Sequence, residues 1–106
     1  SHNSALVANV NATELYEMAF TLANKAKAAE SKAAHAEDFE AAAFFYHAAG
    51  EILVKAALRD LDVAARSKGY EFLARAKLLR VSGERYRVKV ERPLRNKKTR
   101  RIFVAM

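Results

Sequence analysis

Hydrophobic residues recur at helical spacing in three successive stretches, and small residues dominate the middle stretch. Between residues 39 and 58 one broad stripe collects Phe39, Ala42, Ala43, Tyr46, Ala49, Gly50, Leu53, Ala56 and Ala57, with Phe45 and Ile52 at its edge. A surface helix buries one narrow face, so a stripe of this width indicates contact with two neighbours. Because small residues let flanking helices come close, we interpret this segment as the central helix of a small bundle. The alternative is an alanine-rich helix without a special position.

Helical patterns also precede and follow this segment. Asn11, with Glu14 three residues later, resembles a capping box and predicts a first helix from residue 12 to about 35. Asp60 or Asp62 can cap a third helix that ends near residue 80. The apolar positions of these two helices are Leu15, Met18, Ala19, Leu22, Ala26, Ala29 and Ala33, and then Ala65, Gly69, Phe72, Leu73, Ala76 and Leu79. Gly69, in mid-helix, predicts a close helix contact or a kink.

The joint between the first two helices carries no glycine or proline. We place the break at residues 35–38, with Asp38 as the N-cap, because the apolar stripe changes phase near Phe39. One long unbroken helix through this joint is the alternative. The sequence thus predicts an all-α fold, an antiparallel three-helix bundle over residues 12–80, preceded by an arm over residues 1–11 and expected to bury Leu22, Phe39, Tyr46, Leu53, Leu73 and Ala76.

The C-terminal residues 81–106 show a different pattern of apolar and polar positions. Ser82 and Gly83 end the helical pattern, and over residues 85–91 apolar Tyr86, Val88 and Val90 alternate with charged residues, which is strand spacing. Residues 93–98 begin with a proline and predict a turn, and residues 101–104 form a second β-prone run. The extension is therefore compatible with a short β-hairpin. We expect the bundle to stay folded when residues 83–106 are removed.

The excess positive charge belongs to this extension. The chain carries a formal charge of +7, and from Arg80 onward ten basic residues face two acidic ones, a balance of +8. The first 79 residues therefore carry −1. A basic extension with interleaved Tyr86 and Phe103 indicates binding to acidic surfaces, namely nucleic acid, acidic lipid or acidic tubulin tails. The plainer interpretation is a solvated linker or the outer face of a hairpin.

Few residues indicate catalysis. Cysteine is absent, which excludes disulfides, a thiolate nucleophile and a cysteine-based zinc site. His47 and Glu51 lie four residues apart, but no third ligand has a matching spacing, so an ordinary side-chain pair is favoured over a metal site. The three glycines are well separated and form no phosphate-binding loop. No uninterrupted apolar run reaches the roughly 18 residues of a membrane span. We expect no enzymatic activity, no metal and no cofactor.

Two stretches resemble a known family. The run DFEAAAFFYHAAGEIL, residues 38–53, is similar to the second helix of MIT (microtubule interacting and transport) domains. The run ARSKGYEFLARAKLL, residues 65–79, resembles their third helix, with Phe72-Leu73, Arg75-Ala76 and Leu79 at the matching positions. Residues 15–26 resemble the first helix, so the resemblance covers about residues 12–80 and excludes the extension.

The resemblance implies a protein-interaction module rather than an enzyme. MIT domains are adaptors on larger proteins, such as AAA ATPases and calpain-like proteases, and bind short motifs at the ends of ESCRT-III subunits. It implies a cytoplasmic, endosome-associated monomer with a peptide-binding groove between the second and third helices. The matching residues are Ile52, Lys55 and Ala56 on the second helix and Leu73, Ala76, Lys77 and Arg80 on the third.

One departure from the family bears on the ligand. Members that bind the common motif carry an acidic residue after the Arg-Ala pair, where this chain has Lys77. A basic ligand would meet like charge there, so the ligand is expected to be more acidic or to use another groove. Two rival functions remain at this stage: a basic helical nucleic-acid-binding domain, and a bundle used for self-association.

Overall fold

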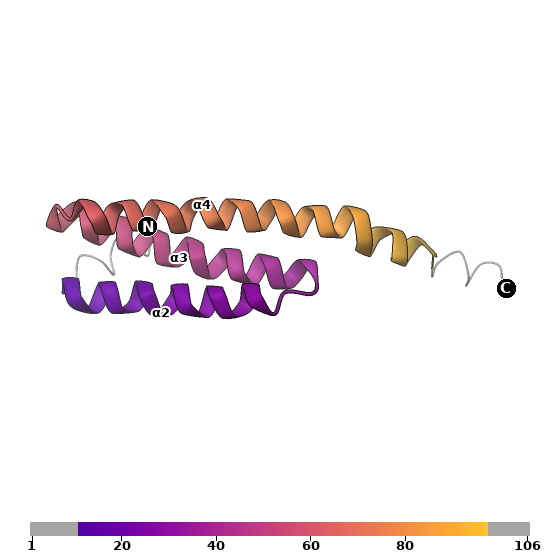
Figure 1. The fold of residues 1–106 in the computed structure, drawn as a ribbon, viewed down its shortest axis with the longest axis horizontal. Helices are drawn as coiled ribbons and strands as arrows, with labels where there is room; N and C mark the ends of the chain where they lie inside the picture. The colour runs from indigo at the N-terminus through magenta and orange to yellow at the C-terminus, as the bar shows by residue number, and fades with distance from the viewer. Residues whose placement is uncertain (1–10, 98–106) are drawn as a thin grey trace.

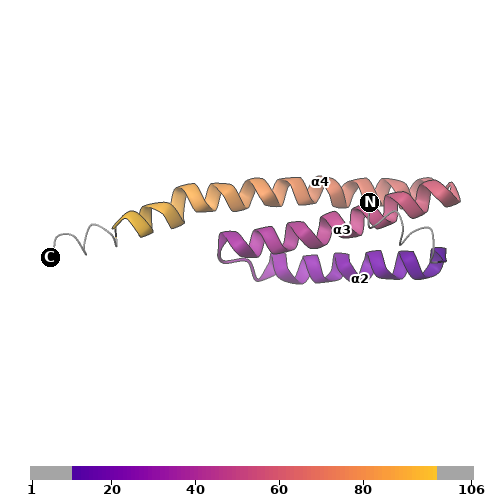
Figure 2. The same cartoon turned by 180° about the vertical axis from the view of Figure 1, so that it is seen from behind.

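The computed structural model describes residues 11–97, and they form an antiparallel bundle of three helices. The helices are α2 (Ala12–Ser31), α3 (Ala36–Asp60) and α4 (Val63–Tyr86), and η1 (Arg87–Glu91), a stretch of π-helix, continues α4 into helical residues 92–97. Figure 1 shows α3 between α2 and α4, and Figure 2 shows the same order from behind. The predicted all-α bundle is confirmed for this part of the chain.

Side chains at the helix starts explain where the helices begin. Asn11 accepts a hydrogen bond from the Glu14 amide at 2.9 Å, and Asp62 accepts one from the Ala65 amide at 3.0 Å, so both predicted caps are confirmed. The break between α2 and α3 is also present, at residues 32–35, which rules out one long helix. The predicted N-cap of α3 is wrong by three residues, because His35 occupies the cap and Asp38 lies in the first turn.

The core consists mainly of alanines, and α3 contributes most of it. Eleven residues of α3 are buried, against five of α4, which confirms α3 as the central helix. Of the residues expected in the core, Tyr46, Leu53 and Ala76 are buried, while Leu22, Phe39 and Leu73 are half-buried. A core of such small side chains requires the helix backbones to lie close together.

Glycines bring α3 and α4 together. A Cβ atom added at Gly50 would lie 2.7 Å from Leu73 Cγ and 2.8 Å from the Gly69 carbonyl oxygen. A Cβ atom added at Gly69 would lie 2.5 Å from Val54 Cγ2. These spaces are too small for a methyl group, so Gly69 marks a close helix contact, one of the two predicted interpretations.

Longer side chains connect α2 to α4. Phe20 of α2 and Phe72 of α4 make an edge-to-face ring contact with centroids 6.2 Å apart. Glu30 of α2 accepts hydrogen bonds from the Tyr46 hydroxyl of α3 and from Arg75 Nε of α4, each at 3.3 Å. Glu30 therefore links all three helices, and burial raises the pKa of the Tyr46 hydroxyl that contacts it.

By length and composition alone, α3 is apolar enough to cross a membrane. In the bundle, 56% of its most apolar 18-residue window is buried. The central helix of a helical bundle has this composition because it is covered on two sides, so the packing accounts for the hydropathy.

The predicted end of the third helix and the predicted strand are wrong. α4 continues through Ser82 and Gly83 to Tyr86, and residues 87–97 are helical, including those predicted as a strand and most of those predicted as a turn. The boundary drawn between residues 80 and 81 therefore falls inside α4. The second β-prone run, residues 101–104, and the arm before residue 11 lie outside the described residues. The described part of the chain contains no strand.

Contacts with the start of α3 explain why this segment is helical. Glu91 Oε1 accepts a hydrogen bond from the Ala36 amide at 2.9 Å, and Arg87 NH2 lies 2.6 Å from Glu40 Oε1. The Tyr86 ring packs 6.3 Å from the Phe39 ring. These partners lie one helical turn apart, at residues 86–87 and 91, so only a helix can present them together. The π-turn ends two residues before Pro93, whose ring would clash with the carbonyl four residues earlier in a regular α-helix.

Candidate functional site

The groove between α3 and α4 has an outer side that faces solvent. Helical spacing from the contact residues Gly50 and Val54 places one row of α3 along it: Glu40, Phe44, His47, Glu51, Val54 and Leu58. The facing row of α4 is Arg66, Tyr70, Leu73, Lys77, Arg80 and Glu84. We call these the α3 row and the α4 row. They run antiparallel, so the first residue of one row faces the last of the other.

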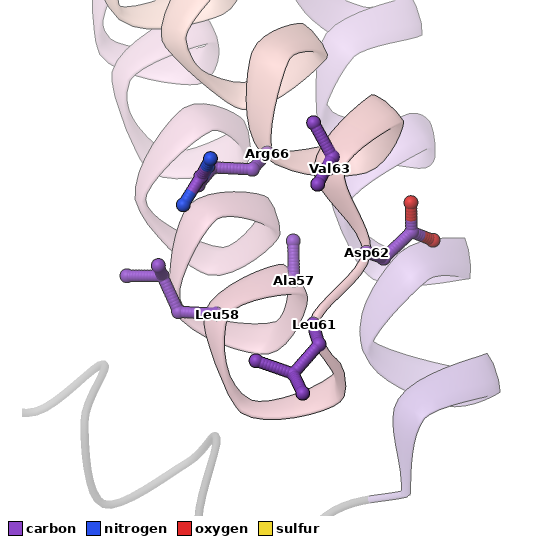
Figure 3. A pocket seen from close by; sticks show the side chains of 6 residues that line it. All are labelled: Ala57, Leu58, Leu61, Asp62, Val63 and Arg66. Atoms are coloured by element: carbon purple, nitrogen blue, oxygen red, sulfur yellow. The ribbon is translucent and has the colours of Figure 1, made fainter.

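Cavities confirm the pairing at both ends of the rows. At one end an open cavity of about 390 Å³ is lined by Glu40, Phe44, Arg80 and Glu84. At the other end a small cavity of about 90 Å³ lies at the α3–α4 turn, and Figure 3 shows Leu58 and Arg66 on the same side of that turn. The groove is therefore hollow at its two ends, and between them the two helices are in close contact, with Leu73 packed over Gly50.

The predicted site residues lie mainly in two environments, the accessible surface of the groove and the buried core. Leu73, Lys77 and Arg80 belong to the α4 row, where Leu73 is half-buried and the two cations are exposed. Ala76 is fully buried beneath this row. The structure thus brings together three of the four predicted α4 residues on one accessible surface.

The predicted α3 residues lie elsewhere. Ile52 is buried and two residues away from both Gly50 and Val54, so it points to about the opposite side of α3 at roughly 100° per residue. Ala56 is likewise buried in the core. Lys55 is half-buried on the flank of α3, with Nζ 3.8 Å from Glu51 Oε2. The α3 side of the groove is formed instead by the α3 row, whose phase the sequence alone did not reveal.

Charge in the groove is unevenly paired. Glu40 is engaged by Arg87, Glu84 accepts a hydrogen bond from Arg92 NH2 at 3.3 Å, and Glu51 contacts His47. Within residues 11–97, Lys77 and Arg80 form no ion pair. The cationic side of the groove is therefore available to an acidic ligand.

Phe44 is an aromatic residue that the sequence analysis did not single out. Its side chain is 67% exposed and packs edge-to-face on Phe45, at the end of the groove that Arg80 lines. Phe44 falls outside the apolar stripe of α3, and an aromatic residue off the buried stripe was the available signal. Large exposed aromatics are common anchors at protein interfaces.

Other candidate chemistry is weak in the described part of the chain. His47 Nε2 contacts Glu51 Oε1, as predicted for an ordinary pair at this spacing. No group of three or more histidine, cysteine or acidic side chains that could hold a metal occurs among residues 11–97. Shallow cavities also lie along α2, one of them beside Tyr16, whose pKa is raised by burial and by the nearby Asp60 carboxylate.

Comparison of the chain with protein-family models, curated proteins and solved structures finds no match.

Proposed function

We propose that this chain is a protein-interaction module that binds a short acidic, amphipathic peptide in the groove between the α3 and α4 rows. The observation that carries the proposal is a half-buried Leu73 with exposed Tyr70 beside it, exposed Phe44 at the Arg80 end of the groove, and two cations that form no ion pair in the described structure. An apolar strip with a cationic rim suits helix-in-groove recognition.

The energetics support binding of moderate strength. Burying one ligand leucine against Leu73 contributes roughly 1.5–3 kcal/mol. Two or three such side chains, less the cost of ordering the peptide, correspond to about micromolar affinity. Lys77 and Arg80 select acidic ligand positions and accelerate association at low salt.

The resemblance to MIT domains supplies the ligand class for this proposal. On that reading the peptides are ESCRT-III-type tails, and the chain is a cytoplasmic, endosome-associated targeting part of a larger sorting or AAA-type protein without catalytic activity of its own. Because Lys77 stands where the family usually has an acid, the preferred tails are those with acidic residues beside their apolar positions.

A fluorescence anisotropy titration with a panel of labelled ESCRT-III-type tails tests the proposal. We expect Leu73→Asp to abolish binding. We expect Lys77→Glu and Arg80→Glu, both at exposed positions, to lower the affinity for acidic tails by at least about tenfold and to raise the affinity for basic tails. Lys25→Glu makes the same charge change on α2 and serves as the control. Circular dichroism checks that each variant folds, since Leu73 also packs over Gly50.

Two outcomes would contradict the groove assignment: no tail binding below millimolar concentration, or Leu73→Asp binding as well as the parent. The groove between α2 and α4, where Phe20 is 44% exposed, is then the next candidate.

Nucleic-acid binding is the second candidate, and the exposed cations Arg85, Lys89 and Lys97 favour it. Affinity for short DNA or RNA that falls steeply with salt, without any peptide binding, would support it instead.

A further inference from the structure

α4, together with the start of η1, carries a second apolar stripe that does not pack inside the bundle. Its inner stripe, which includes Gly69, Phe72, Ala76 and Leu79, is buried in the bundle. On the opposite, exposed side a second series recurs at steps of three or four residues: Val63, Ser67, Tyr70, Ala74, Leu78, Val81, Arg85 and Val88. We call this series the outer seam. Its large apolar residues are 46–63% exposed.

Such a series is the pattern of a helix that packs against another helix. Apolar residues at steps of three and four form the seam of a coiled coil, where side chains of one helix fit between those of the next. The outer seam is about 37 Å long from Val63 to Val88, at 1.5 Å per residue. A surface helix needs no such stripe on its solvent side, so the outer seam is a candidate contact surface for another helix.

The order of polar and apolar residues along the outer seam is nearly symmetric about its centre. The residue types are the same read from either end of the seam. The end residues Val63 and Val88 are apolar, the next residues inward, Ser67 and Arg85, are polar, and the four residues between these are apolar. When two copies lie antiparallel, this symmetry places Val63 opposite Val88 and Tyr70 opposite Val81. It also places Ser67 opposite Arg85, so that the two polar positions share a layer, and Ala74 opposite Leu78 at the centre.

We propose that two copies of this chain pair antiparallel through the outer seam of α4. An isologous contact places the same surface of each copy against itself, which the mirrored order of the seam satisfies and an unrelated partner would not require. Beside the seam, Arg66 of one copy falls opposite Glu84 of the other, twice per pair, whereas the two copies of Lys77 lie on the same flank near the centre of the pair. This departs from the expectation of a monomer, since the sequence alone did not show which side of α4 the bundle covers.

The absence of cysteine makes a disulfide test free of background. Val63→Cys and Val88→Cys are prepared as two separate full-length variants, mixed in equal amounts and oxidised. In the antiparallel pair residues 63 and 88 are opposite each other, whereas two copies of residue 63 are about 37 Å apart. We therefore expect the mixed disulfide to exceed either self-disulfide by at least about tenfold, because a disulfide needs Cα atoms within about 7 Å.

A second substitution tests whether the seam makes the contact. Tyr70→Glu and Val81→Glu, both at exposed positions, should abolish the mixed disulfide and leave the helical circular dichroism unchanged. Thr21→Glu, an exposed position on α2, should leave the disulfide yield as it was. Self-disulfides as abundant as the mixed one, no disulfide in any mixture, or full yield with Tyr70→Glu would each overturn the proposal. Because no peptide is present, this result is independent of the groove proposal.

Discussion

Gly69 has no side chain, and this allows α3 and α4 to lie close together at its position. Its α-carbon faces Val54 across the α3–α4 contact, and an added Cβ would lie 2.5 Å from Val54 Cγ2 and 3.0 Å from the Val54 amide nitrogen. One neighbour at that site is backbone, which cannot move aside without shifting α3. A helical glycine costs about 1 kcal/mol relative to alanine, and at this position the close approach of the helices offsets that cost.

We therefore expect Gly69→Ala to destabilise the bundle by about 1–3 kcal/mol, despite the better helix propensity of alanine. Thermal unfolding followed by circular dichroism measures the effect. Gly83→Ala is the matched control, because its nearest neighbours, Ala36 O and Phe39 Cβ, would lie 3.3 Å away and the change should be milder. If Gly69→Ala melts at or above the parent temperature, the close contact does not fix the spacing of α3 and α4.

Asp38 illustrates how a charge stabilises a helix start. Its Oδ2 accepts hydrogen bonds from the Ala34 and His35 amides, each at 2.9 Å, and these bonds lower the pKa of the Asp38 carboxyl below its ordinary value of 3.8. In the unfolded chain the carboxyl takes up a proton at the higher pH. Its contribution to stability is therefore present above pH 3.8 and is lost as the pH falls through the lowered pKa.

The corresponding prediction concerns Asp38→Ala, compared with the parent by urea unfolding at a series of pH values. The parent should be more stable near neutral pH, and the difference should shrink as the pH falls through 3.8 and below. A difference that stays constant down to the lowest pH would show that the ionised carboxylate is not its source.

At the scale of elements, the C-terminal part of α4 and η1 packs against the bundle and contacts the start of α3. Glu91 satisfies the Ala36 amide, one of the backbone donors that a helix start leaves without an intrahelical partner. Arg87 bonds Glu40 in the same first turns of α3, and these carboxylates raise the pKa of Arg87. The segment after residue 83 therefore packs against the start of the central helix and supplies a hydrogen-bond partner to its first turn.

This contact changes the expectation for truncation. The sequence alone predicts that the bundle stays folded when residues 83–106 are removed, and the structure adds that this truncation lowers its stability. A chain ending at residue 82 should melt below one ending at residue 97 by roughly 4–8 °C, the shift that 1 kcal/mol produces in a domain of this size. Glu91→Ala in the full chain isolates the contact with Ala36. Equal melting temperatures for the two truncated chains would show that these contacts contribute nothing.

On the scale of the whole molecule, α4 contributes to three different surfaces. Its inner stripe closes the bundle, its α4 row forms one wall of the peptide groove, and its outer seam lies opposite the inner stripe and borders the α4 row. Tyr70 belongs to the row and to the seam, so the groove and the self-association surface are neighbours. The length of α4, which runs past the α2–α3 turn in Figure 1, makes room for all three.

The sequence determined the features that depend on local periodicity and caps. The three helices, the central place of the helix at residues 36–60, and the caps at Asn11 and Asp62 follow from apolar spacing and side-chain hydrogen bonding within a few residues. Leu73, Lys77 and Arg80 were assigned to the groove by the resemblance to MIT domains, and the structure places all three on one side of α4.

Only the tertiary structure decided how the helices face each other and where the last one ends. The broad stripe of the central helix fits many rotations, and close contact at Gly50 and Gly69 selects one of them, turning Ile52 and Ala56 away from the groove. Residues 86–91 alternate like a strand, but Tyr86, Arg87 and Glu91 find partners around Ala36, some 50 residues earlier, and those long-range contacts favour the helix. Local spacing cannot encode such contacts, because they depend on which distant residues the fold brings together.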